Sequence, residues 1–155
     1  MSSAMLTFPQ RAALHYGNVA RLIDRLQPVF ALGVRIYLAR VFFLSGLTKL
    51  HDWNITLALF RNEYHVPLLP PAFAAVIGTC AELGLPLLLI MGFGTRFAAA
   101  ALFAFNVVAA ISYPDLSDVG RMFHVLWGVL LLTTFFYGPG KWSFDHLFGR
   151  GGTST

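Results

Sequence analysis

The chain has 155 residues, of which 57% are apolar and only 12% are Asp, Glu, Lys or Arg, and its formal net charge is +4. A soluble domain carries about 25% charged residues, so this composition argues against a soluble enzyme and against a disordered or fibrous protein. Its one cysteine, Cys80, excludes an internal disulfide framework. The basic residues are spread along the chain without a basic run, which indicates membrane orientation and not nucleic-acid binding.

The N-terminal arm, residues 1–28, has apolar residues at helical spacing, with arginines on a different face. This pattern is typical of an amphipathic helix that lies on an anionic lipid surface, and lipid is the first partner we expect. Four apolar segments follow, at about residues 29–50, 72–91, 95–113 and 120–137, each long enough to cross a bilayer. Clusters of proline and glycine separate them and indicate helix ends.

The loop after the first span contains apolar residues that fall on one helical face, namely Trp53, Leu57, Phe60 and Tyr64. The expected fold is therefore all-α: an integral membrane four-helix bundle, residues 29–147, with an N-terminal amphipathic interfacial helix and a short lid helix at the outer face. Residues 148–155 are expected to form a flexible tail. Basic residues are more frequent on the side that holds both termini, which predicts that both termini are cytoplasmic.

Polar groups inside the predicted spans are informative, because a charge at mid-span costs about 2.5–3.5 kcal/mol even on the translocon scale. At a rise of about 1.5 Å per residue, Arg40, Glu82 and Asn106 lie about 12, 13 and 16 Å from the cytoplasmic ends of their spans. We therefore expect these side chains to form a buried polar cluster near the midplane. Such a cluster either fixes the register of the helices or forms a site that contacts a ligand or a proton path.

Two further basic residues lie near the ends of the first span. Arg35 is close to the cytoplasmic end, where a long side chain commonly extends to the headgroups, and we expect it to do so. Lys49, at the outer end, can also extend to the headgroups. Because Ser45 and Thr48 lie one turn away, Lys49 remains a candidate ligand contact as well.

A second polar group is expected at the outer face. Neutral imidazole can ligate a metal or pass a proton, so ordinary interfacial packing, a proton relay, quinone contact and a Cu or Zn site all stay open there. No HxxxH or CxxC spacing specifies a metal, and no metal ligand is assigned. With His124 the only histidine inside a span and no nucleotide-binding loop, we expect no intrinsic haem, flavin or nucleotide. The residues of this group are His51, Asp52, His65, Tyr113, Asp115, Asp118, His124 and Trp127.

Four short motifs occur in order along the chain. They are Arg40 followed by Gly46-Leu47-Thr48-Lys49-Leu50, then Glu82, then the turn from Gly92 to Arg96, and finally Gly138-Pro139-Gly140-Lys141-Trp142-Ser143-Phe144-Asp145. Together they resemble the DoxX family of four-helix inner-membrane proteins. Residues 66–71 and the pair His124 and Trp127 resemble the branch found beside copper-related peptide-maturation genes.

The resemblance implies a redox role, because some DoxX proteins are subunits of a thiosulfate:quinone oxidoreductase and others are partners in membrane redox complexes. The first hypothesis is a quinone-linked subunit that anchors an electron-carrying partner protein. Arg40 or Lys49 would bind a quinone oxygen, and Glu82 or His124 would move protons. The alternative is a non-enzymatic membrane partner or assembly factor for an exported or copper-handling system. A third is a small homodimeric transporter that couples protons through Glu82.

Overall fold

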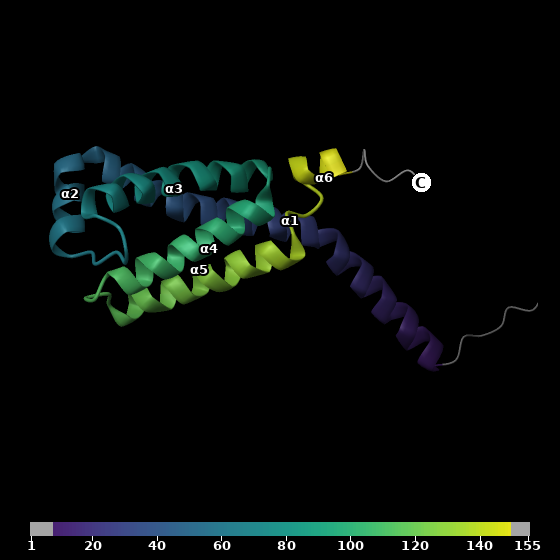
Figure 1. The fold of residues 1–155 in the computed structure, drawn as a ribbon. Helices are drawn as coiled ribbons and strands as arrows, with labels where there is room; N and C mark the ends of the chain where they lie inside the picture. The colour runs from purple at the N-terminus through teal and green to yellow at the C-terminus, as the bar shows by residue number, and fades with distance from the viewer. Residues whose placement is uncertain (1–7, 150–155) are drawn as a thin grey trace, which may run out of the picture.

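The computed structural model describes residues 8–149, and all regular structure in that range is helical. The residues 1–7 of the predicted arm and 150–155 of the predicted tail lie outside it. Four helices are long and apolar enough to cross a membrane, so the prediction of an all-α protein with four apolar helices is confirmed. The helices are α1 (Phe8–His51), α2 (Trp53–Asn62), α3 (Pro71–Met91), α4 (Thr95–Ser112), α5 (Asp118–Tyr137) and α6 (Phe144–Gly149) (Figure 1).

The predicted arm and the predicted first span form one continuous helix, α1, which has Pro28 in its interior. The N-terminal part of α1 extends away from the other helices (Figure 1). Its apolar side chains are exposed there, including Leu22, Ile23, Leu26 and Phe30. Within residues 8–149 no other helix covers this face, and contact of the arm with a lipid surface stays our expectation.

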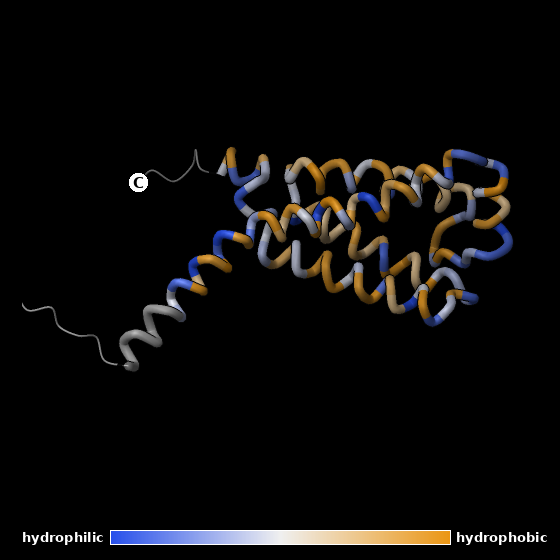
Figure 2. Tube along the Cα trace, turned by 180° about the vertical axis from the view of Figure 1, so that it is seen from behind, coloured by the Kyte–Doolittle hydropathy of each residue, from blue (hydrophilic) through white to orange (hydrophobic). Residues whose placement is uncertain are grey.

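The four long helices pack as two pairs, α1 with α3 and α4 with α5. A close approach between α1 and α3 requires Gly46, because a Cβ at this position would lie 2.8 Å from the side chain of Leu83. Buried leucines, among them Leu38, Leu102 and Leu131, fill the centre of the bundle. The residues of the four helices are mostly apolar within the bundle, whereas polar residues are frequent in the loops (Figure 2). Many large apolar side chains of these helices are exposed, as expected for helices that face lipid.

The two pairs are held together at the end of the bundle that carries the α3–α4 turn and α6, which we name the clasp end. The opposite end is the α2 end. Toward the α2 end, α3 and the α4–α5 pair diverge, and α2 with the loop after it lies across that end (Figure 1). The lid helix expected from the sequence is therefore present as α2. Its Phe60 packs on Ala74 and Ala75 of α3.

The clasp end is built around Arg35, which is 1% exposed and donates a hydrogen bond to the backbone carbonyl of Trp142. The prediction that Arg35 extends to the headgroups is wrong, because the segment before α6 folds over the guanidinium and covers it. Both carboxylate oxygens of Asp145 accept hydrogen bonds at 2.8 Å, from the backbone amides of Gly94 and Thr95 at the start of α4. The amide of Asp145 donates to the carbonyl of Gly92 at 2.9 Å. The segment from Gly138 to Asp145, which we name the closing motif, thus holds the α3–α4 turn in place.

Asp145 lies outside the spanning helices, and its environment sets its charge. Burial tends to raise its pKa, but hydrogen bonds from Thr95 and Gly94, with the nearby charge of Arg35, outweigh burial and hold the pKa of Asp145 below its ordinary value. A carboxylate whose pKa is lowered by folding stabilises the folded state above its unfolded pKa of about 3.9. That stabilisation is lost as the pH falls through the lower, folded pKa.

We expect Asp145→Asn to lower the stability of the protein by about 1 kcal/mol near neutral pH, since a charged cap of the first turn of α4 is lost. The difference from wild type should begin to shrink below about pH 4 and should be lost as the pH falls through the lower, folded pKa of Asp145. Thermal unfolding in detergent micelles across this pH range measures both effects. Asp115→Asn, a change at an exposed carboxylate of the α2 end, is the control. A stability difference that stays constant with pH would contradict this account of Asp145.

Candidate ligand-binding cavity

A cavity of about 580 Å³ lies where the two helix pairs diverge, a volume in the range of small-molecule sites. Its walls come from α1, α3, α4 and α5, and α2 and the loop after it form the roof. Most of its lining is apolar. It includes the aromatic rings of Phe42, Phe60, Phe105 and Trp127. The cavity is therefore suited to an apolar or amphipathic molecule, with a few polar groups to orient it.

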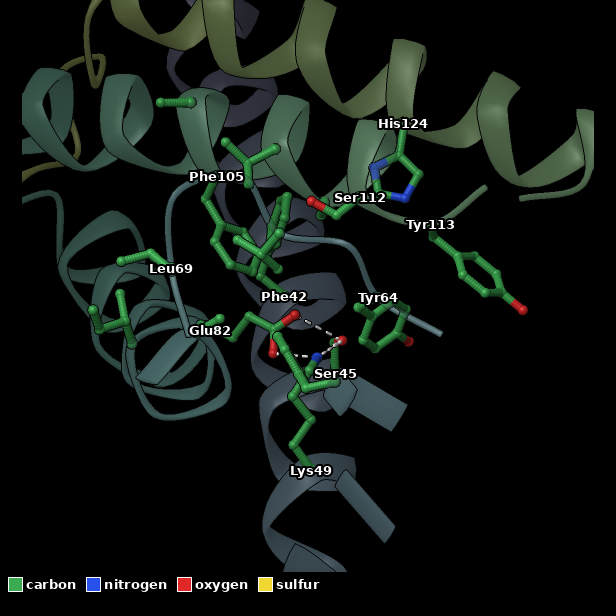
Figure 3. Close-up of a pocket in the computed structure, with 18 of the residues that line it drawn as sticks. Phe42, Ser45, Lys49, Tyr64, Leu69, Glu82, Phe105, Ser112, Tyr113 and His124 are labelled. Atoms are coloured by element: carbon green, nitrogen blue, oxygen red, sulfur yellow. Dashed lines mark hydrogen bonds and ion pairs between the residues drawn. The ribbon is translucent and has the colours of Figure 1, made fainter. Parts of the chain in front are cut away.

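The polar centre of the cavity is a triad of Ser45, Lys49 and Glu82 (Figure 3). The Nζ atom of Lys49 lies 2.6 Å from Oε2 of Glu82 and 3.2 Å from the hydroxyl of Ser45. The Ser45 hydroxyl donates to Oε1 of Glu82 at 3.0 Å. The Glu82 side chain is only 6% exposed, so its charge is neutralised by Lys49 inside the bundle, as a buried ion pair requires.

The predicted cluster of Arg40, Glu82 and Asn106 is wrong. Arg40 is exposed and does not line the cavity, and the partner of Glu82 is Lys49. At about 100° of rotation per residue, the offset of nine residues from Arg40 to Lys49 places them on opposite faces of α1. Lys49 reaches Glu82 because helical side chains lean toward the N-terminus of their helix. Depth alone was therefore insufficient to choose the partner of Glu82.

Asn106 belongs to a second polar group, with His124 of α5. The Asn106 amide nitrogen donates to the backbone carbonyl of His124 at 2.8 Å, and its Oδ1 lies 2.8 Å from Nδ1 of the imidazole. Because an amide oxygen only accepts, Nδ1 carries the hydrogen, and the neutral ring keeps Nε2 as an acceptor. His124 lines the cavity, whereas Asn106 lies behind it and is 3% exposed. Asn106 is thus a positioning residue for His124.

Two polar residues of the cavity, Ser112 and Tyr64, were not singled out as ligand contacts from the sequence, whereas Tyr113 belongs to the predicted outer polar group. The rings of the two tyrosines meet edge to face at 5.3 Å. Burial, followed by the nearby Tyr113, raises the pKa of Tyr64, so its phenol stays protonated and available as a hydrogen-bond donor. Ser112 shares a face of α4 with Phe105 at helical spacing, which is the one sequence signal that could have identified it.

The outer polar group predicted from the sequence does not assemble into one site. His51 and His65 are exposed, and Asp52 caps α2 by accepting a hydrogen bond from the amide of Ile55 at 2.9 Å. Within the part of the chain that the structure describes, no three His, Cys, Asp or Glu side chains lie close enough to hold a metal ion. Only His124, Tyr113 and Trp127 of this group line the cavity.

Comparison with known proteins identifies the family. No curated protein and no solved structure matches the chain. The family model described as DoxX matches residues 30–114, more than half of the chain, and this match does not distinguish the copper-associated branch. The matched range includes Lys49 and Glu82, whereas α5 with His124 and the closing motif lie beyond it. The chain therefore belongs to the DoxX family of membrane proteins.

Proposed function

We propose that this protein is a membrane subunit of a redox complex, which binds a quinone in the cavity and anchors a partner protein that carries the electrons. The single observation that carries the proposal is the triad of Ser45, Lys49 and Glu82 inside an otherwise apolar cavity. A quinone has a ring that fits an apolar, aromatic space and carbonyl oxygens that accept hydrogen bonds. Arg40 lies outside the cavity, so Lys49, and not Arg40, would bind a quinone oxygen.

The polar groups of the cavity fit the needs of a quinone head. Lys49 carries three donors, of which Ser45 and Glu82 use two, so one remains for a carbonyl oxygen. The Ser112 hydroxyl is buried and has no hydrogen-bond partner in residues 16–149. Since a buried polar group without a partner costs about 1–3 kcal/mol, a ligand oxygen near Ser112 would remove that cost.

Proton transfer would fall to Glu82 and His124. A bound quinone supplies two-electron chemistry that also takes up two protons. Glu82 can accept or give a proton beside Lys49, and His124 can do so through Nε2, because Asn106 holds Nδ1. The electrons would come from the partner protein. We also propose that the clasp end faces the cytoplasm of a bacterium, since the N-terminal arm and α6 lie at that end (Figure 1).

The test is a titration of quinone binding to purified protein in lipid nanodiscs, with Lys49→Met and Arg40→Met as a matched pair. Each variant removes one cation from α1, but only Lys49 lines the cavity. We expect Lys49→Met to weaken binding about 10- to 100-fold, the usual worth of a hydrogen bond from a charged group, and Arg40→Met to bind like wild type. Equal affinities for all three proteins would contradict the proposal and favour a non-enzymatic partner or assembly factor.

A further inference from the structure

The exposure of the cavity lining is uneven around the bundle. Four lining residues are exposed at the surface, and all four belong to α3, to α4 or to the loop before α3; they are Leu69, Ile77, Ala104 and Val108. The lining residues that come from α1, α2 and α5 are buried or half-buried. The cavity is therefore open to the outside on one side, between α3 and α4.

The opposite side, between α1 and α5, is closed by side chains. Trp127 of α5 donates a hydrogen bond from its indole nitrogen to the hydroxyl of Tyr37 of α1 at 3.2 Å. Its ring also contacts Phe42 edge to face, with the centroids 6.0 Å apart. Phe60, Tyr64 and Val66 belong to the roof at the α2 end, where Phe60 is buried and the other two are half-buried. The α1–α5 side presents no exposed lining residue, and the exposed lining residue of the roof is Leu69, two residues before the start of α3.

The opening lies within the spanning part of the bundle and has an apolar rim. Ile77 belongs to α3 and Val108 to α4, and both helices are candidate membrane spans. They are 46% and 37% exposed, respectively. A rim of aliphatic side chains at this depth faces acyl chains and not water. A ligand that uses this opening must therefore be soluble in the lipid phase.

We propose that the α3–α4 opening is a lateral portal, through which the ligand enters from the bilayer and through which its long hydrophobic tail continues to project. The ligand class is an amphiphile with a polar head beside Ser45, Lys49 and Glu82 and an alkyl or isoprenoid tail that crosses the rim at Ile77 and Val108. The inference rests on the proposed binding function of the cavity and adds the requirement for a tail.

The test compares two benzoquinones with the same substituted ring, one with a decyl tail and one with a methyl group in its place. Tritium-labelled forms of both are bound to protein in nanodiscs, with the variants Ile77→Trp and Val76→Trp. Val76 is the matched control, because it is the preceding residue of α3, is 49% exposed and does not line the cavity. Val108→Trp and Val107→Trp repeat the comparison on α4, where Val107 is 42% exposed and also outside the lining.

We expect Ile77→Trp to weaken binding of the decyl quinone about tenfold or more, because an indole overfills the rim that the tail must cross. Val76→Trp should bind it like wild type, and the methyl quinone should be affected less than the decyl quinone. If wild type binds both quinones and Ile77→Trp matches Val76→Trp, the portal is wrong while the proposed function stands. If wild type binds neither quinone, the proposed function and the portal both fail.

Discussion

Replacing either member of the Lys49–Glu82 pair alone should destabilise the protein by about 3–5 kcal/mol, because each single change leaves a buried charge without its partner. The pair is short, at 2.6 Å, and the Glu82 side chain is 6% exposed. Lys49→Met and Glu82→Leu should each show this loss, whereas the double variant should recover most of it, since an apolar pair of similar volume is often neutral. Unfolding of all four proteins in mixed detergent micelles completes the double-mutant cycle.

Arg40→Met is the control for this cycle, because it removes a cation from the exposed face of α1. Its effect on stability should be small. Single changes at Lys49 and Glu82 that each cost less than about 1 kcal/mol would indicate that the two charges are solvated by water in the cavity and do not depend on one another.

The second large effect is expected for Gly92→Ala at the clasp end, which should lose about 3 kcal/mol or more. Gly92 has a φ of +70°, a region that favours glycine, and a Cβ here would lie 2.2 Å from Nη1 of Arg35 and 2.9 Å from the Cα of Ser143. Because Arg35 is fully buried and Ser143 contributes backbone, neither can move aside without displacing the closing segment.

Gly94→Ala separates the two causes of that loss. Gly94 also has a positive φ, +56°, but a Cβ there would meet no atom within 4 Å. Its cost should therefore be limited to about 1 kcal/mol of backbone strain. Thermal unfolding of the two variants gives the comparison, and equal losses would mean that the close packing of Arg35 and Ser143 on Gly92 contributes nothing to stability.

The sequence was sufficient to predict the helices, but not the faces on which their polar residues lie. The apolar segments and their Pro and Gly boundaries predicted all four long helices, because length and composition determine which segments can cross a bilayer. Glu82 was identified correctly as a buried charge. Its partner was chosen by depth, and the rotation of α1 instead brings Lys49 to Glu82 and directs Arg40 to the exposed face.

The clasp end could not be derived from the sequence for a different reason. The closing motif was recognised by its resemblance to the DoxX family, but its contacts join segments far apart in the chain, such as Arg35 with Trp142 and Asp145 with Gly94. A pattern within one segment does not contain such partners. The short helix α6 was likewise not predicted, because a helix of this length depends on its surroundings more than on propensity.

The two ends of the bundle have different roles in this account. At the clasp end, the closing motif covers Arg35 and caps α4, so the helices are held close together. At the α2 end they diverge, and the space between them forms the cavity (Figure 3). A substitution at the clasp end should therefore affect the stability of the protein more than it affects the chemistry of Lys49 and Glu82.

Photolabelling shows whether the cavity beside Lys49 and Glu82 holds the head of a quinone. A photoreactive azidoquinone is bound to the wild-type protein in nanodiscs, irradiated, and the labelled residues are identified by mass spectrometry. We expect label within residues 41–49, 77–82, 104–113 and 124–127, which contain much of the lining, and loss of this label with excess unlabelled quinone. Label on the exposed arm and on residues of α5 outside the lining, such as Val129, that is unchanged by excess quinone would show that no quinone head occupies the cavity.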